Sequence, residues 1–234
     1  MRIPAPEMAF AAQIARDGFA VIPGVLSDSD TSALADHLKL SPLPRTRAGA
    51  RHAMRDAAVS RTARDSRLLQ LAHQVLGAEA IPFRATLFDK SPTANWLVVW
   101  HQDTALPLRE RHDTPCWGPW SVKDGITYAH APASALESIL ALRLHLDDSR
   151  ADNGPLRVLP ATHKLGVLSD DQLHDLSTKV AAVDCLVPKG GIVAMRPLIV
   201  HASSKSHSAL PRRVLHIEYA ASSHIADGLD LAIV

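Results

Sequence analysis

Several features that mark whole classes of protein are scarce or missing in this chain of 234 residues. Only two cysteines occur, Cys116 and Cys185, without CxxC spacing, so we expect free thiols in a reducing cytoplasm and no disulfide framework. No apolar run approaches the roughly 20 residues of a membrane-spanning helix. Residues 1–10 lack the basic and then apolar pattern of a signal peptide. The sequence therefore predicts a cytoplasmic protein with no membrane partner.

The sequence also lacks an excess of charge of either sign. Its 25 lysines and arginines nearly balance 24 aspartates and glutamates, which gives a formal net charge of +1. Nucleic acids attract strongly basic proteins, so no nucleic-acid partner is expected. A chain of this length can bury enough surface to need no cross-links. We expect one domain over residues 1–234, present as a monomer or a small homo-oligomer.

Helices are expected mainly in the first third of the chain, about residues 1–80. Apolar residues recur with a helical period over residues 68–76, and Gly77 then favours a helix end. A short strand is predicted at residues 18–23. Residues 41–58 are rich in proline, glycine and arginine without a clear period, and a loop is expected there.

From Ile81 onward the sequence changes to short strands separated by turns such as Asn153-Gly154. The expected strands are residues 83–88, 95–102, 139–147, 156–159, 180–187, 191–195, 198–201 and 213–221. Many short strands with few helices favour an antiparallel double sheet or barrel. Residues 104–133 interrupt the strands and are expected to form a long irregular loop. A loop of that length is seldom a plain connection, so we predict a lid over the site.

His101 and Asp103 end an apolar strand and offer two metal ligands. Residues two apart on a strand face the same side, so the imidazole and the carboxylate can reach one point. An ionised aspartate there would be costly without a metal or a charged partner. A histidine from a distant strand would complete the two-histidine, one-carboxylate set of non-haem iron oxygenases. His201 is the preferred third ligand, with His145 and His163 as alternatives.

Two arginines, Arg212 and Arg213, stand at the start of the last predicted strand. An arginine at the mouth of a barrel suits two-point binding of a carboxylate. Ser203, two residues beyond His201, is placed to donate its hydroxyl to the same carboxylate. The simpler interpretations are an exposed basic pair and a turn serine.

These stretches, taken in order, resemble the phytanoyl-CoA dioxygenase family over nearly the whole chain. The resemblance is carried by residues 18–26, 100–103, 145–148, 153–156, 160–163, 201–203 and Arg212. It is weakest over residues 41–75 and 104–135. It implies a mainly β fold, a double-stranded β-helix (jelly roll, cupin-like), in which about residues 1–80 form a helical support layer and about 81–234 the core.

The same resemblance implies an iron(II)- and 2-oxoglutarate-dependent dioxygenase that consumes O2 and hydroxylates a C–H bond of a small molecule. His101 and Asp103 resemble the family's proximal metal ligands, and His201 resembles the distal one. Related halogenases lack the carboxylate ligand, so Asp103 favours hydroxylation. Residues 104–107 differ from those that follow this motif in ectoine hydroxylases, so ectoine is not the expected substrate.

The resemblance also implies where 2-oxoglutarate binds. Arg212 resembles the group that holds the outer carboxylate, helped by Ser203, and Arg213 is the alternative one residue along. Asn95 shares the inward parity of His101 on its predicted strand and is a further candidate for co-substrate binding.

Four residues are expected to contact the substrate. Lys90 and Arg143 are predicted to face the cavity, and Trp117 and Trp120 lie in the predicted lid. Cationic groups near aromatic ones indicate a small molecule with an anionic group. Two other functions stay open at this point: a non-oxidative metal-dependent enzyme on a cupin-type barrel, and a ligand-binding protein that has lost turnover.

Overall fold

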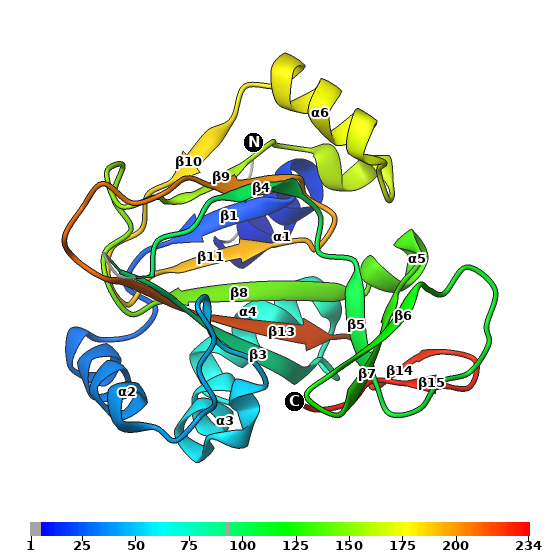
Figure 1. Cartoon of the computed structure of the whole chain (residues 1–234), viewed down its shortest axis with the longest axis horizontal. Helices are drawn as coiled ribbons and strands as arrows, with labels where there is room; N and C mark the ends of the chain where they lie inside the picture. Colours follow the sequence, from blue (N-terminus) through cyan, green and yellow to red (C-terminus); the bar gives the residue numbers. More distant parts are fainter. Residues whose placement is uncertain (1–5, 92–93) are drawn as a thin grey trace.

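Two antiparallel sheets form the centre of the protein in a computed structural model that describes residues 6–91 and 94–234 (Figure 1). The larger sheet has the strand order β1 (Phe19–Ile22), β11 (Ile192–Met195), β8 (Ile139–His145), β13 (Arg212–Ala220), β3 (Ile81–Lys90) and β2 (Gly49–Ala50). The smaller sheet has the order β10 (Val183–Cys185), β9 (Leu156–Val158), β12 (His201–Ser203) and β4 (Val98–His101). All pairings within these two sheets are antiparallel, which confirms the predicted double sheet.

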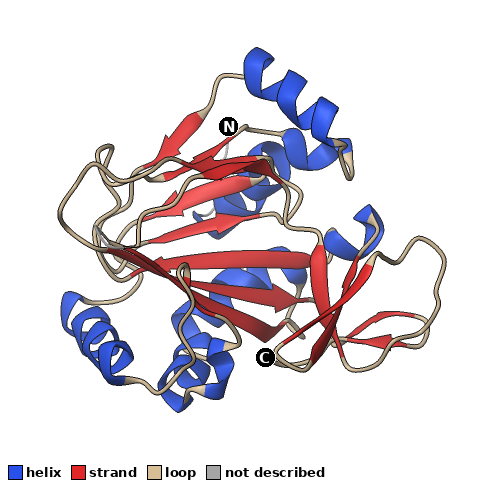
Figure 2. Cartoon of the chain, viewed as in Figure 1, coloured by secondary structure: helices blue, strands red, loops and turns tan. Residues whose placement is uncertain are grey.

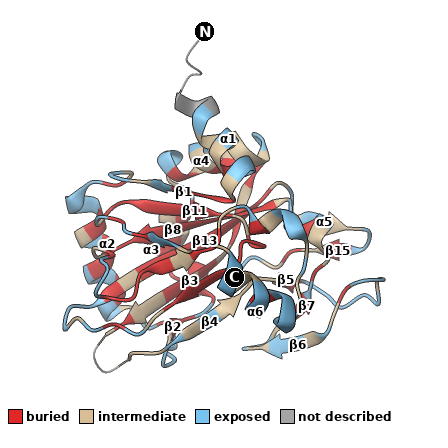
Figure 3. Ribbon diagram, turned by 90° about the horizontal axis from the view of Figure 1, so that it is seen from above, coloured by how far each residue is buried: buried red, intermediate tan, exposed pale blue. Residues whose placement is uncertain are grey.

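Helices cover the outer faces of both sheets (Figure 2). Those near the N-terminus are α1 (Pro6–Asp17), α2 (Asp28–Leu40), α3 (Ala57–Ala63) and α4 (Ser66–Leu76). Their apolar side chains share one buried cluster with alternate residues of the large sheet, such as Leu142 and Leu144 of β8 and Leu215 of β13. Figure 3 shows the buried strands beneath helices whose outer sides are exposed. Because side chains alternate along a strand, Arg143 and His145 face the interior between the sheets.

Local signals explain where two of these helices begin and end. The Ser27 hydroxyl accepts a hydrogen bond from the Asp30 backbone N–H at 3.0 Å, which caps the start of α2. Gly77, with φ of 96°, ends α4 as predicted, and its N–H bonds the carbonyl of His73. None of the described helices is long and apolar enough to cross a membrane.

Residues 41–58 are more ordered than the predicted loop. They contain β2, the 3-10 helix η1 (Ala53–Arg55) and the start of α3. The Asp56 carboxylate accepts the backbone N–H groups of Ala58 and Val59 and so caps α3. These elements are only two to seven residues long, too short to show a period in the sequence.

Residues 104–133 are the largest departure from the sequence prediction. In place of an irregular loop they contain a third sheet, with the order β5 (Ala105–Leu108), β7 (Ile126–His130) and β6 (Trp120–Lys123). A helical turn, α5 (Ala133–Leu136), follows. This sheet lies beside the hairpin of β14 (His224–Ala226) and β15 (Leu229–Asp230) at the right of Figure 1. Trp117 is 9% exposed and belongs to the apolar cluster that joins the two. The expectation of irregular structure is therefore wrong for residues 105–108, 120–123 and 126–130.

Several strands are shifted from their predicted bounds. β4 begins at Val98, three residues later than predicted, and β12 begins at His201, where the predicted strand ended. The apolar run 198–200 is buried without being a strand. Residue 180 ends a helix, α6 (Asp170–Lys179), that the sequence analysis did not predict and that begins at a capping box formed by Ser169 and Gln172. A buried segment is apolar whether or not it is a strand, so an apolar composition could not locate the ends of these strands.

Candidate metal centre and the two cavities beside it

His101, Asp103 and His201 come together between β4 and β12. The two histidines are directly opposed in the antiparallel pairing of these strands, and their ring centroids are 4.1 Å apart. The Asp103 carboxylate lies 3.7 Å from Nε2 of His101 and 3.5 Å from Nε2 of His201. One ligand atom from each residue lies within 4.8 Å of the other two. In the described part of the chain no other set of three histidine, cysteine or acidic residues is this close.

Backbone carbonyls orient both imidazole rings. Nδ1 of His101 lies 2.8 Å from the carbonyl oxygen of Val99, and Nδ1 of His201 lies 2.9 Å from that of Ile199. A carbonyl can only accept, so Nδ1 carries the proton in each ring and Nε2 keeps its lone pair. This arrangement is typical of metal-binding histidines. Burial lowers the pKa of His201 to about 4, which keeps its imidazole neutral at neutral pH.

Asp103 is held in place by the residues around it. Its backbone N–H donates to the carbonyl of Pro197 at 3.0 Å. The side chain of Gln102 points away from the site, where its amide donates to the carbonyls of Gly166 and Leu198. Burial would raise the pKa of Asp103, but the neighbouring imidazole of His201 and the guanidinium of Arg84 outweigh burial and keep that pKa well below its usual value. Asp103 is therefore an ionised candidate ligand.

The alternative third ligands lie elsewhere. Nε2 of His163 is 3.3 Å from the carbonyl oxygen of Ala15, against α1. His145 is fully buried on β8, and neither of its ring nitrogens has a hydrogen-bond partner. Neither histidine joins the group formed with Asp103. The structure thus brings His201, and not these two, to the predicted metal position.

A cavity rich in positive charge opens beside the three candidate ligands. We call it the cationic cavity, and it is lined by Phe88, Lys90, Trp96, Val98, His101, Asp103, Arg143, Leu156, His201, Ala202, Ser203 and Arg212. Three of its cations, Lys90, Arg143 and Arg212, are at least nine-tenths buried. None of these three forms an ion pair with a carboxylate in the described residues. Unpaired buried cations are costly, so this cavity is suited to an anion.

The adjacent arginines of β13 point in opposite directions. Arg212 faces the cationic cavity, where Nε donates to the carbonyl of Asn153 at 3.1 Å and Nη2 to the Ser203 hydroxyl at 3.3 Å. Arg213 instead binds both carboxylate oxygens of Asp147, at 2.8 and 2.7 Å. The pair with Asp147 neutralises Arg213, so only Arg212 retains an uncompensated charge.

Lys90 and Ser203 complete the closed end of the cationic cavity. Nζ of Lys90 donates to the Ser203 hydroxyl at 2.9 Å and to the carbonyl of Ser204 at 2.6 Å. Burial, reinforced by the charges of Arg212 and Arg143, lowers the pKa of Lys90 to about 8. Both of these acceptors are uncharged, so neither balances the charge of Lys90.

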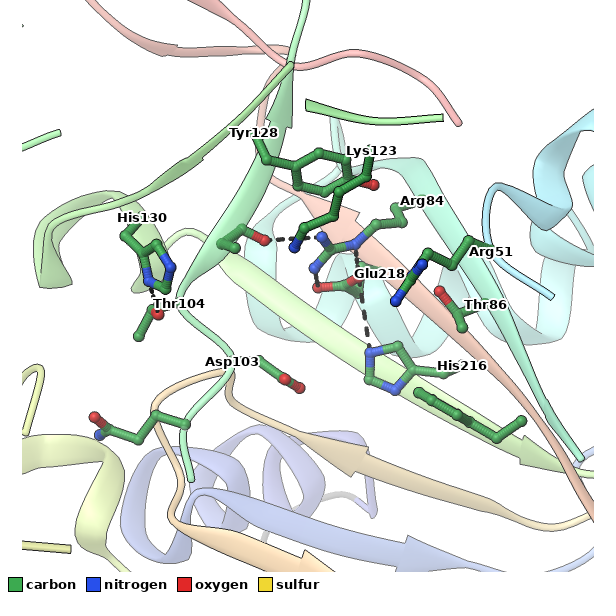
Figure 4. A pocket seen from close by; sticks show the side chains of 13 residues that line it. Arg51, Arg84, Thr86, Asp103, Thr104, Lys123, Tyr128, His130, His216 and Glu218 are labelled. Carbon is green, nitrogen blue, oxygen red and sulfur yellow. Dashed lines mark hydrogen bonds and ion pairs between the residues drawn. The ribbon is translucent and has the colours of Figure 1, made fainter. Parts of the chain in front are cut away.

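A second cavity also borders Asp103 (Figure 4). We call it the open pocket, and it is lined by Arg51, Arg84, Thr86, Phe88, Gln102, Asp103, Thr104, Ala105, Lys123, Tyr128, His130, His216 and Glu218. Phe88 and Asp103 line both cavities. The candidate metal centre therefore lies where the cationic cavity meets the open pocket.

An ion pair forms one wall of the open pocket. The Arg84 guanidinium binds both oxygens of the Glu218 carboxylate and donates to the carbonyl of Ala105 at 2.8 Å. Nε2 of His216 lies 3.7 Å from the same carboxylate, while its Nδ1 accepts from Arg143 at 3.0 Å. This row of polar side chains on the inner faces of β3, β8 and β13 links the two cavities.

Comparison with known proteins assigns the chain to a family. The sequence model of phytanoyl-CoA dioxygenase (PhyH) matches residues 14–214, most of the chain. The chain belongs to this family. The resemblance inferred from the motifs is thereby confirmed. Family membership and the His-Asp-His set together support an oxygenase that uses iron and 2-oxoglutarate.

A curated relative and several solved structures match nearly the whole of this family member. L-proline trans-4-hydroxylase of Streptomyces griseoviridis is 27% identical over 259 residues, which cover 94% of this chain and 88% of the relative. The epimerase SnoN, in complex with Fe3+, alpha ketoglutarate and nogalamycin RO, has a TM-score of 0.69 at 19% identity, covering 94% of this chain and 86% of its own. EctD from S. alaskensis with bound Fe has a TM-score of 0.68 at 18% identity, covering 93% and 76%. These structures confirm the predicted jelly roll.

Three residues predicted to touch co-substrate or substrate lie away from both cavities. Asn95 precedes β4, and its amide exchanges hydrogen bonds of 2.8 and 2.7 Å with the backbone of Ser206, so both ends of the amide are already engaged. Trp117 packs in the apolar cluster beside the third sheet, and Trp120 lies under the guanidinium of Arg111. In the predicted strand 95–102, Asn95 would face inward like His101. The observed strand β4 begins at Val98, so Asn95 lies outside it.

The sequence analysis missed several residues of the open pocket. Arg84, His216 and Glu218 alternate with apolar residues on β3 and β13, and this alternation was a usable sign of an inward-facing polar row. Arg51 gave no such sign, because it lies in a segment without a period. Lys123 gave no such sign either, because it lies in the segment that was expected to be irregular.

Proposed function

We propose that this family member is an iron(II)- and 2-oxoglutarate-dependent dioxygenase that hydroxylates a C–H bond of a small organic molecule. The observation that supports this most is the position of the His-Asp-His set at the meeting point of two cavities. One cavity carries three cations without carboxylate partners, and the other is open to a second ligand. A two-substrate reaction at one metal requires such an arrangement.

His101, Asp103 and His201 fit an iron(II) ion. Two neutral imidazole nitrogens and one carboxylate oxygen, gathered on one side of a point, leave the other positions of an octahedral ion free. When bound there, iron(II) activates O2 as 2-oxoglutarate is converted to succinate and CO2, which supplies the oxidising power for hydroxylation. Asp103 would supply the carboxylate ligand and would balance part of the charge of the metal.

Arg212, Ser203 and Lys90 are the proposed site for the outer carboxylate of 2-oxoglutarate. Arg212 presents a planar fork of donors that matches the two oxygens of a carboxylate. The Ser203 hydroxyl and the Lys90 ammonium lie within hydrogen-bond distance of each other beside it. Binding a dianion here would offset the cost of burying these cations. The fixed positions of these donors would orient the keto acid toward the metal ligands.

The open pocket is the proposed substrate site. It shares Asp103 with the cationic cavity, so a molecule bound there would lie next to the metal while 2-oxoglutarate occupies the other side. The name of the 27%-identical relative, L-proline trans-4-hydroxylase, supports a small-molecule substrate. Residues of the third sheet line the pocket, as Lys123 and Tyr128 do, and would limit access of water to the reacting centre.

Succinate formation tests this function. Purified protein is incubated with iron(II), 2-oxoglutarate and air, and succinate is measured with each component omitted in turn. We expect formation to require all three and to be lost in Asp103→Ala. An exposed aspartate of α6, Asp171, provides the control variant Asp171→Ala, which should behave as wild type. If metal binds tightly but no succinate forms, a non-oxidative enzyme or a ligand-binding protein is the correct description.

A further inference from the structure

We propose that Arg51 and Lys123 form a binding site for a carboxylate group of the organic substrate, so that the substrate of this enzyme is a small carboxylic acid. The inference rests on the proposed function, because it places this site in the open pocket beside the candidate metal centre. It concerns residues that neither the metal nor the co-substrate requires.

Both side chains carry a charge that nothing in the described structure neutralises. Arg51 makes no hydrogen bond and no ion pair there. Lys123 has no carboxylate partner either, and its Nζ lies 4.8 Å from the centroid of the Tyr128 ring. Burial, together with the nearby charges of Arg51 and Arg84, lowers the pKa of Lys123. Two cations that line one pocket repel each other. An anion bound between them would relieve this repulsion, so the pocket favours an anion.

The acidic groups of the pocket are already engaged. Both oxygens of Glu218 bind Arg84, whose Nη1 also donates to the carbonyl of Ala105. Asp103 belongs to the candidate metal set. Glu218 and Asp103 are the acidic residues that line the pocket, so neither is free to pair with Arg51 or Lys123.

A buried contact holds together the two segments that carry these cations, while the Arg51 side chain itself is exposed. Arg51 is followed by His52, and Nε2 of His52 lies 2.9 Å from the hydroxyl of Tyr128. The two rings also stack, with centroids 6.1 Å apart and planes 19° apart. Both residues are almost fully buried, at 2% and 4% exposed. This contact joins the segment that carries Arg51 to the hairpin of β6 and β7, which carries Lys123.

The position of the two cations indicates how a substrate would lie. Figure 4 shows Lys123 and Arg51 on the opposite side of the pocket from Asp103. A molecule held at that side by its carboxylate would extend its carbon skeleton toward the metal ligands. The planar guanidinium of Arg51 suits the two oxygens of a carboxylate, and the Lys123 ammonium adds a second point of charge. The acid group would thus fix which carbon reaches the reacting centre.

The test compares acids with their uncharged amides in the iron-loaded enzyme at saturating 2-oxoglutarate. The probes are the twenty L-amino acids and straight-chain monocarboxylic acids of two to six carbons, each paired with its carboxamide. The measurement is succinate formation above the rate without any probe. We expect at least one acid to stimulate succinate formation about tenfold more effectively than its amide, the effect of a charge-assisted contact worth about 1.4 kcal/mol.

Single substitutions then test whether Arg51 and Lys123 cause the preference for an acid over its amide. Arg51→Gln and Lys123→Gln should each raise the half-saturating concentration of the acid about tenfold and leave that of the amide nearly unchanged. Lys123→Arg should retain the preference for the acid. Arg47 is exposed and lies four residues before Arg51 on the same segment, so Arg47→Gln is the matched control and should leave the preference intact. Damage to the fold would weaken acid and amide alike.

Three outcomes overturn the proposal: no acid in the panel is preferred over its amide, only phosphate-bearing compounds stimulate turnover in a parallel panel of sugar phosphates, or the preference survives in both Gln variants. Basal succinate formation separates this failure from failure of the proposed function. If wild-type protein forms no succinate with iron(II), 2-oxoglutarate and air, the oxygenase assignment itself is wrong. If it does and acids are not preferred, only the carboxylate site is wrong.

Discussion

The two cavities that meet at Asp103 are built from different parts of the molecule. The cationic cavity lies between the central strands, and its cations come from β3, β8 and β13. The open pocket shares β3 and β13 but is completed by Arg51, next to η1, and by residues of β5 and β7. A substitution in the cationic cavity disturbs the core of the double sheet. The segments outside the double sheet that complete the open pocket, which we call the added segments, can change with less effect on the double sheet. We therefore expect co-substrate binding to depend on core strands and substrate choice on the added segments.

The largest effect is expected where the two cavities meet. His201→Ala should lose tight iron binding and all iron-dependent turnover, because two remaining ligands hold the ion poorly. Iron affinity is measured by anaerobic calorimetric titration, and the fold by circular dichroism. His163→Ala and His174→Ala serve as controls, since His163 contacts α1 and His174 is exposed on α6. Retained activity in His201→Ala with loss in His163→Ala would show that the metal set is misassigned.

A large effect on stability alone is expected from the third sheet. Trp117→Ala should lower the free energy of unfolding by about 3–5 kcal/mol, the usual cost of removing a buried aromatic side chain, while each succinate still accompanies one hydroxylation. Trp120 is only partly buried, so Trp120→Ala should cost less. Chemical denaturation and the ratio of product to succinate measure the two quantities. If Trp120→Ala instead forms succinate without product, residues 104–133 act as the substrate-gating lid that the sequence suggested.

The cationic cavity should respond to loss of Arg212 and not of its neighbour. Arg212→Ala should weaken 2-oxoglutarate binding by about 2–4 kcal/mol, because a carboxylate would be left buried without its partner. Arg213→Ala removes the pair with Asp147 and a hydrogen bond to the carbonyl of Ala35, and should change stability slightly but not 2-oxoglutarate affinity. The KM for 2-oxoglutarate is measured for both. Equal, small effects would mean that neither arginine binds the co-substrate.

A smaller effect, dependent on pH, is expected from Lys90. Its pKa is about 8 in the folded protein, below the ordinary 10.5. Above pH 8 the ammonium is lost, and 2-oxoglutarate binding should weaken by about 1.5–3 kcal/mol as a charged hydrogen bond disappears. Lys90 itself has the opposite effect on folding: between pH 8 and 10.5 the unfolded chain holds more protons, so its contribution to the free energy of unfolding rises with pH.

Lys90→Met tests this pH effect. The variant should bind 2-oxoglutarate weakly at pH 7 and lose the further weakening above pH 8. Lys179, exposed and paired with Asp175 on α6, provides the control Lys179→Met, which should follow the wild-type profile. A wild-type profile that is flat from pH 7 to 10 would exclude Lys90 as a contact of the co-substrate.

The metal ligands and the cationic cavity were more predictable from the sequence than the open pocket. Strand parity predicted that His101 and Asp103 lie together, and they do, although β4 ends at His101 and Asp103 follows it. Sequence could not choose between Arg212 and Arg213, because a shift of one residue reverses every side chain and only the register of β13 decides. Parity also misplaced Asn95, since it holds only within a strand and β4 starts at Val98.

In the segments that complete the open pocket, contacts between residues far apart in the sequence determine the structure. β5, β6 and β7 are four or five residues long and include Pro107 and Gly125 in or between them, so no period marks them. The proximity of Arg51 to Lys123 depends on the bond between His52 and Tyr128, 76 positions apart. No local pattern encodes such a pairing, and only the folded chain reveals it.

An anaerobic visible spectrum of the protein with iron(II) tests the central claim most directly, because it requires the metal set and the cationic cavity to act on one ligand. Addition of 2-oxoglutarate should produce a weak charge-transfer band. The band should be absent in His201→Ala and should need far more 2-oxoglutarate in Arg212→Ala, whereas Arg213→Ala should match wild type. Tight iron binding with no band at saturating 2-oxoglutarate would contradict the account.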